Sequence, residues 1–108
     1  MGEARLPVHI EVSGLMRRAE AAGGFATILA RGDWEAGTIM VVTCHKGRDF
    51  RAWERLPQPD GTRSWTCSRE EDPADPAAFT TYLDRRRQQD SDLWIVELDI
   101  AEGERFIR

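Results

Sequence analysis

The densest hydrophobic pattern of the chain lies in residues 90–100 (DSDLWIVELDI), where four apolar residues run together and then alternate with acids. The even-numbered positions from Trp94 to Ile100 are all apolar, whereas the odd-numbered positions turn acidic at Glu97 and Asp99. Because side chains alternate across a strand, this pattern predicts a strand that is covered on both faces at its start and wetted on one face at its end. We expect it to form the middle of the scaffold, with two helices on its Trp94 face.

Five further segments are rich in β-branched and apolar residues and are bounded by turn residues. They are residues 7–12, 25–31, 38–44, 50–56 and 62–68. Alternation and a leading proline predict that the first is a half-buried edge strand. Gly32 and Gly37 predict a hairpin between the second and third strands, and residues 57–61 predict one between the fourth and fifth. Both faces of the first hairpin are apolar, which fits a sheet covered twice, a partial barrel or a face that meets another chain.

Two segments have helical spacing. Residues 15–22 place Leu15 and Ala19 on one face, after Ser13 as N-cap and before a Gly-Gly stop. Asp75 followed by Pro76 is a strong start signal for a second helix. The order β-α-β-β-β-β-α-β, with a short final strand as an option, predicts an α+β fold. We expect a single domain over residues 1–108, with a curved, mostly antiparallel sheet and two helices.

Composition narrows the range of functions. The formal net charge of −4 leaves no long-range basic field for nucleic acid or an anionic membrane. No apolar run is long enough to span a bilayer, and residues 1–12 lack the pattern of a secretory signal. Two cysteines without an export signal indicate reduced thiols, so we expect a cytoplasmic protein.

A family resemblance is carried by two parts of the chain. These are residues 17–42 (RRAEAAGGFATILARGDWEAGTIMVV), and DSDLWIVELD followed by EGERFI. Together they make the chain resemble a family of small stand-alone alphaproteobacterial proteins, a domain of unknown function. The resemblance implies a cytoplasmic bacterial protein. It supplies no activity, cofactor or catalytic residue.

Residues of the types that bind metals or act as nucleophiles are present, but their spacing matches no known site. Cys44 and Cys67 are expected on one sheet face, but their spacing with His45 fits no zinc pattern, so we interpret them as buried, inert thiols. Glu97 and Asp99 form a carboxylate pair on one strand face, a layout found in metal-dependent nucleases. The companion lysine of such sites is missing, which favours a wetted strand face that pairs with arginines. We expect no metal and no cofactor.

Four tryptophans and several arginines supply the candidate surfaces. In the second hairpin, a loop centred on Pro59 would place Trp53 opposite Trp65 and Arg55 opposite Arg63. Core, protein interface and stacking platform remain open for this face, and shared burial with Met40, Val42 and Cys44 would favour core. Trp34, on a loop tip, is a further interface candidate. The candidate interface or ligand surface comprises Trp34, Arg51, Trp53, Arg55, Arg63 and Trp65.

A candidate anion site depends on how the two helices pack. If both lie on one sheet face, Arg17, Arg18 and Arg86 could approach one another, although solvated ion pairs with nearby acids are the default. The sequence therefore predicts a non-enzymatic binding or accessory protein that acts through protein–protein contacts, as a homodimer or with an unidentified partner. A nucleic-acid or nucleotide binder that uses the Arg/Trp hairpin is the first alternative, and a metal-dependent hydrolase is the second.

Overall fold

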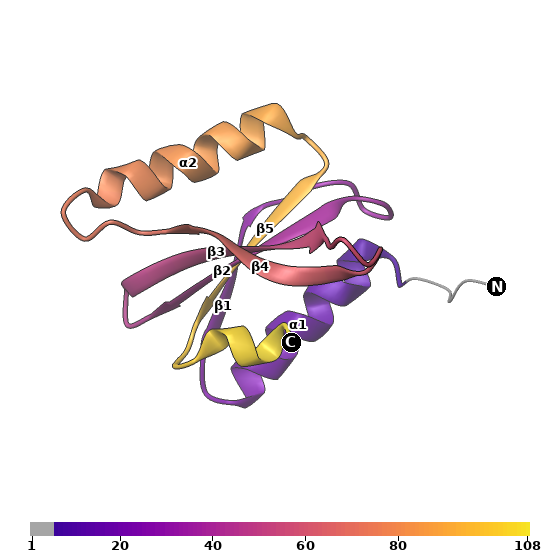
Figure 1. Ribbon diagram of the computed structural model, residues 1–108. Helices are drawn as coiled ribbons and strands as arrows, with labels where there is room; N and C mark the ends of the chain where they lie inside the picture. Colours follow the sequence, from indigo (N-terminus) through magenta and orange to yellow (C-terminus); the bar gives the residue numbers. More distant parts are fainter. Residues whose placement is uncertain (1–5) are drawn as a thin grey trace.

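The computed structural model describes residues 6–108 as two helices and a five-stranded sheet (Figure 1). Residues 1–5, part of the segment predicted to lack a secretory signal, lie outside the described residues. The α+β class is confirmed. The elements are α1 (Val8–Ala21), β1 (Phe25–Ala30), β2 (Thr38–His45), β3 (Arg48–Pro57), β4 (Arg63–Glu70), α2 (Pro76–Gln89), β5 (Leu93–Asp99) and the 3-10 helix η1 (Gly103–Phe106).

The predicted first strand is wrong, because residues 8–12 form the first turns of α1. Val8 and Val12 are four residues apart, and together with Leu15 and Ala19 they make one buried helical stripe. Ile10, which strand alternation would bury with them, is 46% exposed. The period-two pattern was a coincidence within a longer helical one.

The order of strands in the sheet is β1-β5-β2-β3-β4. β5 is antiparallel to β1 and parallel to β2, and the other two pairings are antiparallel. The predicted hairpin between β1 and β2 is therefore wrong, since β5 lies between them. A strand whose first four residues are buried on both faces is suited to such an interior position.

The loop between β1 and β2 crosses the start of β5 instead of turning tightly. The amide of Asp33 donates a hydrogen bond to the Asp92 carbonyl oxygen at 3.2 Å. At Gly32 and Gly37 a Cβ atom would overlap that same carbonyl group. Both glycines thus permit a close approach of two backbone segments, which is a different role from the predicted hairpin turn.

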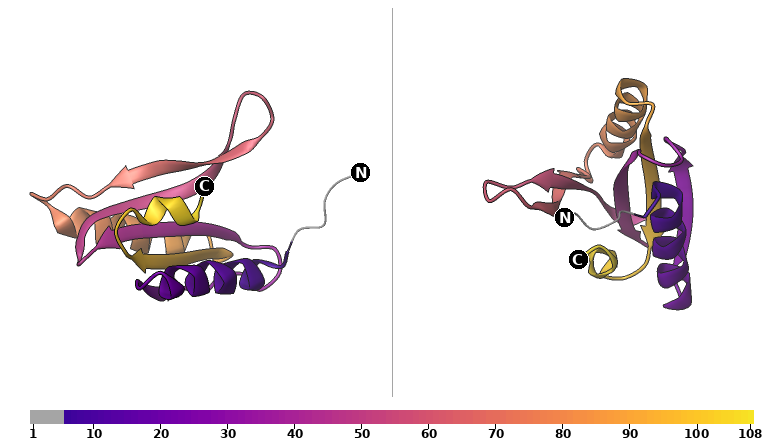
Figure 2. Two further views of the ribbon diagram at one scale, coloured as in Figure 1. Left: turned by 90° about the horizontal axis from the view of Figure 1, so that it is seen from below. Right: turned by 90° about the vertical axis from the view of Figure 1, so that its right-hand side faces the viewer.

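The helices cover opposite faces of the sheet (Figures 1 and 2). α1 and η1 pack on the face that holds Trp94, Val96 and Leu98, whereas Phe79 of α2 packs on the face that holds Leu93 and Ile95. The predicted burial of β5 is confirmed, since residues 93–96 are buried and both acids are half-buried. The prediction that both helices sit on the Trp94 face is wrong, because the second apolar face also needs a cover.

α2 is held by the buried Phe79, by the half-buried Tyr82 and Leu83, which pack against the same core, and by one polar network. Phe79 is its only fully buried side chain. Arg86 donates two hydrogen bonds to the Glu54 carboxylate, at 2.7 and 2.8 Å, and a third to the Tyr82 hydroxyl at 3.1 Å. Within residues 6–108, no helix has the length and apolarity needed to cross a membrane.

Candidate functional site: a basic groove between α1 and the β3–β4 hairpin

The β3–β4 hairpin sets the position of the arginines and tryptophans predicted to form a surface. Arg55 lies opposite Trp65, and Trp53 lies opposite Cys67. The predicted register, with Trp53 opposite Trp65, is therefore wrong by two residues. The turn is centred on Asp60, whose carboxylate accepts hydrogen bonds from the backbone amide and the hydroxyl of Thr62, and not on Pro59.

A shift of two residues between β3 and β4 does not change which side chains of the hairpin share a face, so Trp53, Arg55 and Trp65 remain on one face as predicted. Trp53 is paired with Val41 of β2, so Trp53, Arg55 and Trp65 belong to the α1 face. The prediction that Met40, Val42 and Cys44 share this face is wrong. Met40 and Val42 pack under α2.

A groove of about 290 Å³ lies between α1, this hairpin and the C-terminal segment. Leu15, Ile39 and Ile107 are buried and form its floor, and the half-buried rings of Trp65 and Phe106 complete the apolar part. We call this the basic groove. Its charged lining residues are Glu11, Arg18, Arg55, Arg63 and Arg108.

Arg55 is held from two sides within the basic groove. Its guanidinium pairs with the Glu11 carboxylate of α1 at 2.9 and 3.2 Å, and it lies 5.0 Å from the Trp65 ring centroid. Within residues 6–108, Arg18, Arg63 and Arg108 make no ion pair. Four guanidinium groups therefore face one carboxylate, which makes the groove locally basic in an acidic chain.

Two of the predicted hairpin residues lie outside the groove. The indole N–H of Trp53 donates to the Thr43 hydroxyl at 2.9 Å, and its ring packs against the α1-face core. Arg51 forms an exposed ion pair with Glu70 at 3.3 Å. The predicted surface is thus divided, and only Arg55, Arg63 and Trp65 share the groove.

Trp34 closes the N-terminal end of α1. Its ring is 57% exposed, yet it stacks on His9 with a centroid distance of 3.9 Å. The Trp34 carbonyl oxygen accepts a hydrogen bond from the His9 backbone amide at 3.2 Å and lies 2.9 Å from His9 Nδ1. The indole thus packs on His9 and lies 6.4 Å from the Trp94 ring centroid, while more than half of the residue remains exposed.

The candidate anion site of Arg17, Arg18 and Arg86 is not brought together. Arg17 and Arg18 are exposed on α1, whereas Arg86 binds Glu54 on the α2 face. The sheet lies between them (Figure 2). The predicted approach required both helices on one face, and this condition is not met.

The thiols and the carboxylate pair are poorly suited to catalysis. Burial, followed by the charges of Glu97 and Asp99, raises the pKa of the Cys44 thiol to about 12, and burial also raises the pKa of the Cys67 thiol. Burial and Asp99 raise the pKa of the Glu97 carboxyl. The two thiols do not share a face as predicted, because Cys44 is next to Asp99 and Cys67 is paired with Trp53. In the described part of the chain, no group of three or more His, Cys, Asp or Glu could hold a metal ion.

The contributions of α1 and of the C-terminal segment to the groove were missed from the sequence. Glu11, Leu15 and Ile107 are far apart along the chain, and only the tertiary packing brings them to Trp65. No local pattern in the sequence marks these two segments as partners of the hairpin.

The chain belongs to a family described as "Protein of unknown function (DUF1491)", whose model matches residues 6–108. Two solved structures of a DUF1491 protein from Caulobacter crescentus are similar to it. The crystal structure has a TM-score of 0.79 and 33% identity, with 94% of each chain covered. The NMR structure has a TM-score of 0.78 and 32% identity, with 97% of this chain and 94% of that chain covered.

A protein from Agrobacterium tumefaciens is similar as well. Its solution structure has a TM-score of 0.73 and 30% identity, with 96% of this chain and 93% of that chain covered. None of the curated proteins matches the chain. The resemblance to an alphaproteobacterial family of unknown function is thus confirmed, and no relative brings an activity with it.

Proposed function

We propose that this DUF1491 protein is a non-enzymatic binding protein that acts through protein–protein contacts at the basic groove. The observation that carries the proposal is the composition of the groove, with four guanidinium groups against one carboxylate over an apolar floor. The ligand that matches this lining is an acidic segment of a partner protein with an aliphatic or aromatic side chain among its acids. Guanidinium forks pair bidentately with carboxylates, and the floor takes the apolar side chain.

The size of the groove supports a segment over a large cofactor. Its volume of about 290 Å³ is at the lower end of the range for small-molecule pockets. Arg55 is already fixed by Glu11 and Trp65, so it offers a preorganised contact whose side-chain entropy has been lost before binding. Arg18 and Arg63 are exposed and can engage carboxylates at the rim. Arginine and apolar side chains can bind a ligand, but the lining of the basic groove includes no nucleophile with an adjacent base.

A nucleic-acid or nucleotide ligand is the second candidate, favoured by the adjacency of Arg55 and Trp65. Aromatic rings flanked by cations stack bases in single-stranded nucleic-acid binders. Two observations rank it lower. Arg55 lies over the Trp65 ring, where a base would have to stack, and the net charge of −4 disfavours the approach of a polyanion.

The proposal extends to location. Both cysteines are free thiols, and the two are not neighbours in the sheet. Free thiols are typical of a reducing compartment, so we place the protein in the cytoplasm.

The test is an NMR titration of the ¹⁵N-labelled chain with three probes. These are a short Glu-rich peptide with a central Leu-Phe pair, the same peptide with Gln in place of Glu, and oligothymidylate. We expect shifts of the Trp65 indole N–H with the acidic peptide alone, and weaker binding at high salt because exposed charges are screened.

A matched pair of variants decides whether the groove is the site. Arg63→Glu should weaken the acidic peptide about tenfold or more, since it replaces an attraction by a repulsion. Arg85→Glu, an equal charge change at an exposed position on α2, should leave the affinity unchanged. Equal binding of the Gln peptide, or unchanged binding by Arg63→Glu, would contradict the proposal. Binding of oligothymidylate alone would establish the second candidate in its place.

A further inference from the structure

One edge of the sheet lacks the features that normally protect an edge strand. β1 has the sequence FATILA, with no charged residue and no proline, and its only strand neighbour in the described chain is β5. The opposite edge, β4, carries Arg63, Arg69 and Glu70. Charges and prolines are the usual means by which an exposed edge avoids pairing with another strand. The bare edge of β1 is therefore suited to strand addition.

The α2 face of this edge has a protruding aromatic ring at one end. Phe25 is 73% exposed, the most exposed of the large hydrophobic side chains in the described residues. It pairs with Asp99 of β5, on the part of the face that α2 leaves open. A single exposed phenylalanine is not unusual on a protein surface, but here the ring stands directly beside the bare edge, where a strand added to β1 would contact it.

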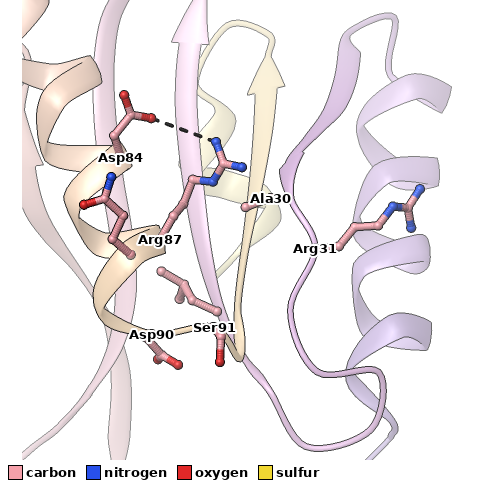
Figure 3. A pocket seen from close by; sticks show the side chains of 8 residues that line it. Ala30, Arg31, Asp84, Arg87, Asp90 and Ser91 are labelled. Carbon is pink, nitrogen blue, oxygen red and sulfur yellow. Dashed lines mark ion pairs between the residues drawn. The ribbon is translucent and has the colours of Figure 1, made fainter.

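The other end of β1 has a hollow on the same face (Figure 3). The hollow measures about 480 Å³, and Ala30 and Leu93 are its apolar lining residues. Asp84 and Arg87 of α2 form an ion pair at 3.9 Å on its far side. Arg31 also lines the hollow, and its side chain extends toward α1 (Figure 3). Phe25 protrudes at one end of β1, and at the other end Ala30 and Leu93 offer a small apolar contact within a lining that is otherwise polar or charged.

We propose that β1 pairs antiparallel with β1 of a second copy, about a twofold axis at Thr27, so that one continuous sheet runs through both copies. Antiparallel pairing reverses the strand, so Phe25 of each copy lies opposite Leu29 of the other and reaches the mouth of the hollow beside Ala30. Thr27 faces Thr27, a favourable cross-strand pair. All paired side chains in this register are uncharged.

Charge complementarity on the α1 face supports a second copy as the occupant. In the same register Arg31 of one copy approaches the C-terminal end of α1 in the other, just before its β1. That end carries the negative pole of the helix dipole and the exposed Glu20, together with the exposed Arg18 in the same turn, so the attraction for Arg31 comes from the dipole and Glu20. The twofold axis makes the contact between Arg31 and the end of α1 twice, and it also makes the contact between Phe25 and the hollow twice. A strand from an unrelated protein would not match both ends of β1 in this way.

The first test is the oligomeric state, measured by light scattering and sedimentation over a wide range of protein concentrations. The full chain should be a dimer at high concentration. Phe25→Lys should be monomeric at the same concentration, because it places a charge on the edge and removes the ring. Leu56→Lys is the matched control on β3, where the replaced side chain is 37% exposed, and it should dimerise like the unchanged protein. Circular dichroism of each variant checks that the fold is kept.

The second test fixes the geometry. In a Cys67→Ser background, Thr27→Cys should form a disulfide-linked dimer under mild oxidation, since opposite residues of antiparallel strands lie within disulfide range. Thr62→Cys, in the same background and at an exposed position on the β3–β4 turn, should form disulfide-linked dimers much more slowly. A strict monomer at every concentration would overturn the proposal. So would a dimer that survives Phe25→Lys, or equal cross-linking at both positions.

Discussion

At the scale of single residues, the surroundings of Glu97 disfavour the ionised form of its carboxyl group. Burial and the neighbouring Asp99 raise the pKa of its carboxyl above the usual 4.5. The group is therefore harder to ionise in the folded than in the unfolded chain, so its contribution to stability is present below pH 4.5 and is lost as pH rises through the folded-state pKa. Glu97→Gln should raise the free energy of unfolding at pH 7, and this gain should vanish below about pH 4.

Denaturant titrations of the unchanged protein and of Glu97→Gln at several pH values measure this prediction. A pH-independent effect of Glu97→Gln would mean that packing, and not ionisation, is responsible. The sign is opposite for Glu54, because its hydrogen bonds from Arg86 lower the pKa of its carboxyl. The stability that Glu54 provides is present above pH 4.5 and is lost as pH falls through its folded-state pKa.

The two cysteines should differ in reactivity. Cys44 is 4% exposed and the pKa of its thiol is raised to about 12, whereas Cys67 is only half-buried. Because the thiolate is the reactive form, alkylation of the native chain at pH 8 should modify Cys67 and leave Cys44 intact, and both should react after unfolding. Peptide mass spectrometry after a timed iodoacetamide treatment measures this. Faster labelling of Cys44 in the native chain would contradict the burial described for it.

At the scale of elements, α2 depends on few contacts, so its polar anchor should be measurable. Removing Arg86 leaves the half-buried Glu54 carboxylate without its bidentate partner. Arg86→Ala should destabilise the protein by about 1–3 kcal/mol, the usual effect of leaving a buried polar group unsatisfied. Arg87→Ala, which removes only the exposed ion pair to Asp84, should change the free energy of unfolding by less than about 0.5 kcal/mol. Equal effects of the two substitutions would show that Glu54 is rehydrated.

Glycines in two elements should respond in opposite ways to alanine. Gly14 lies inside α1, and a methyl group added there would lie 3.5 Å from the nearest side-chain atom, an ordinary contact distance. Gly14→Ala should therefore stabilise the protein by about 1 kcal/mol through helix propensity. Gly37→Ala should destabilise it, because the new methyl group would overlap the Asp92 carbonyl and separate the loop from the start of β5. Thermal melts of both variants test the pair, and stabilisation by Gly37→Ala would refute the close approach.

The elements also show what could be predicted from the sequence. The two-sided burial of β5 and the β3–β4 hairpin depend on local alternation and turn residues, and both were predicted. The start of α1 was not, because Val8, Ile10 and Val12 fit period two while Val8, Val12 and Leu15 fit a helix, and only the sheet decides which face is buried. The insertion of β5 beside β1 joins segments about 70 residues apart, which no local pattern specifies.

The same limit applies to the candidate site. Arg55, Arg63 and Trp65 were predicted on one face, because a register error of two residues does not change the face. The other lining residues come from α1 and from the C-terminal segment, so the groove exists only after tertiary packing. Trp53 was a candidate through its expected pairing with Trp65, and Trp34 through its place on a loop tip. Their partners Thr43 and His9 could not be assigned from the sequence.

At the scale of the whole molecule, the two proposed surfaces lie toward opposite edges of the sheet. The basic groove is beside the β3–β4 hairpin, and the pairing edge is β1, with β5 and β2 between them (Figure 1). The two surfaces share no residue, although α1 contributes Arg18 to the groove and Glu20 to the dimer contact, and sites without shared residues usually behave additively. A dimer formed through β1 would therefore carry two basic grooves directed away from the twofold axis, available to the same partner.

Independence of the two surfaces is the last prediction. Phe25→Lys should abolish dimerisation and bind the acidic peptide with unchanged affinity per chain. Arg63→Glu should lose peptide affinity and dimerise like the unchanged protein. A peptide with two acidic segments on a flexible linker should bind the dimer more tightly than it binds Phe25→Lys, because the second segment binds at a raised effective concentration. Calorimetry of the unchanged protein and of Phe25→Lys, each with the one-segment and the two-segment peptide, measures the gain. A loss of affinity for the one-segment peptide in Phe25→Lys would show instead that the groove depends on the dimer.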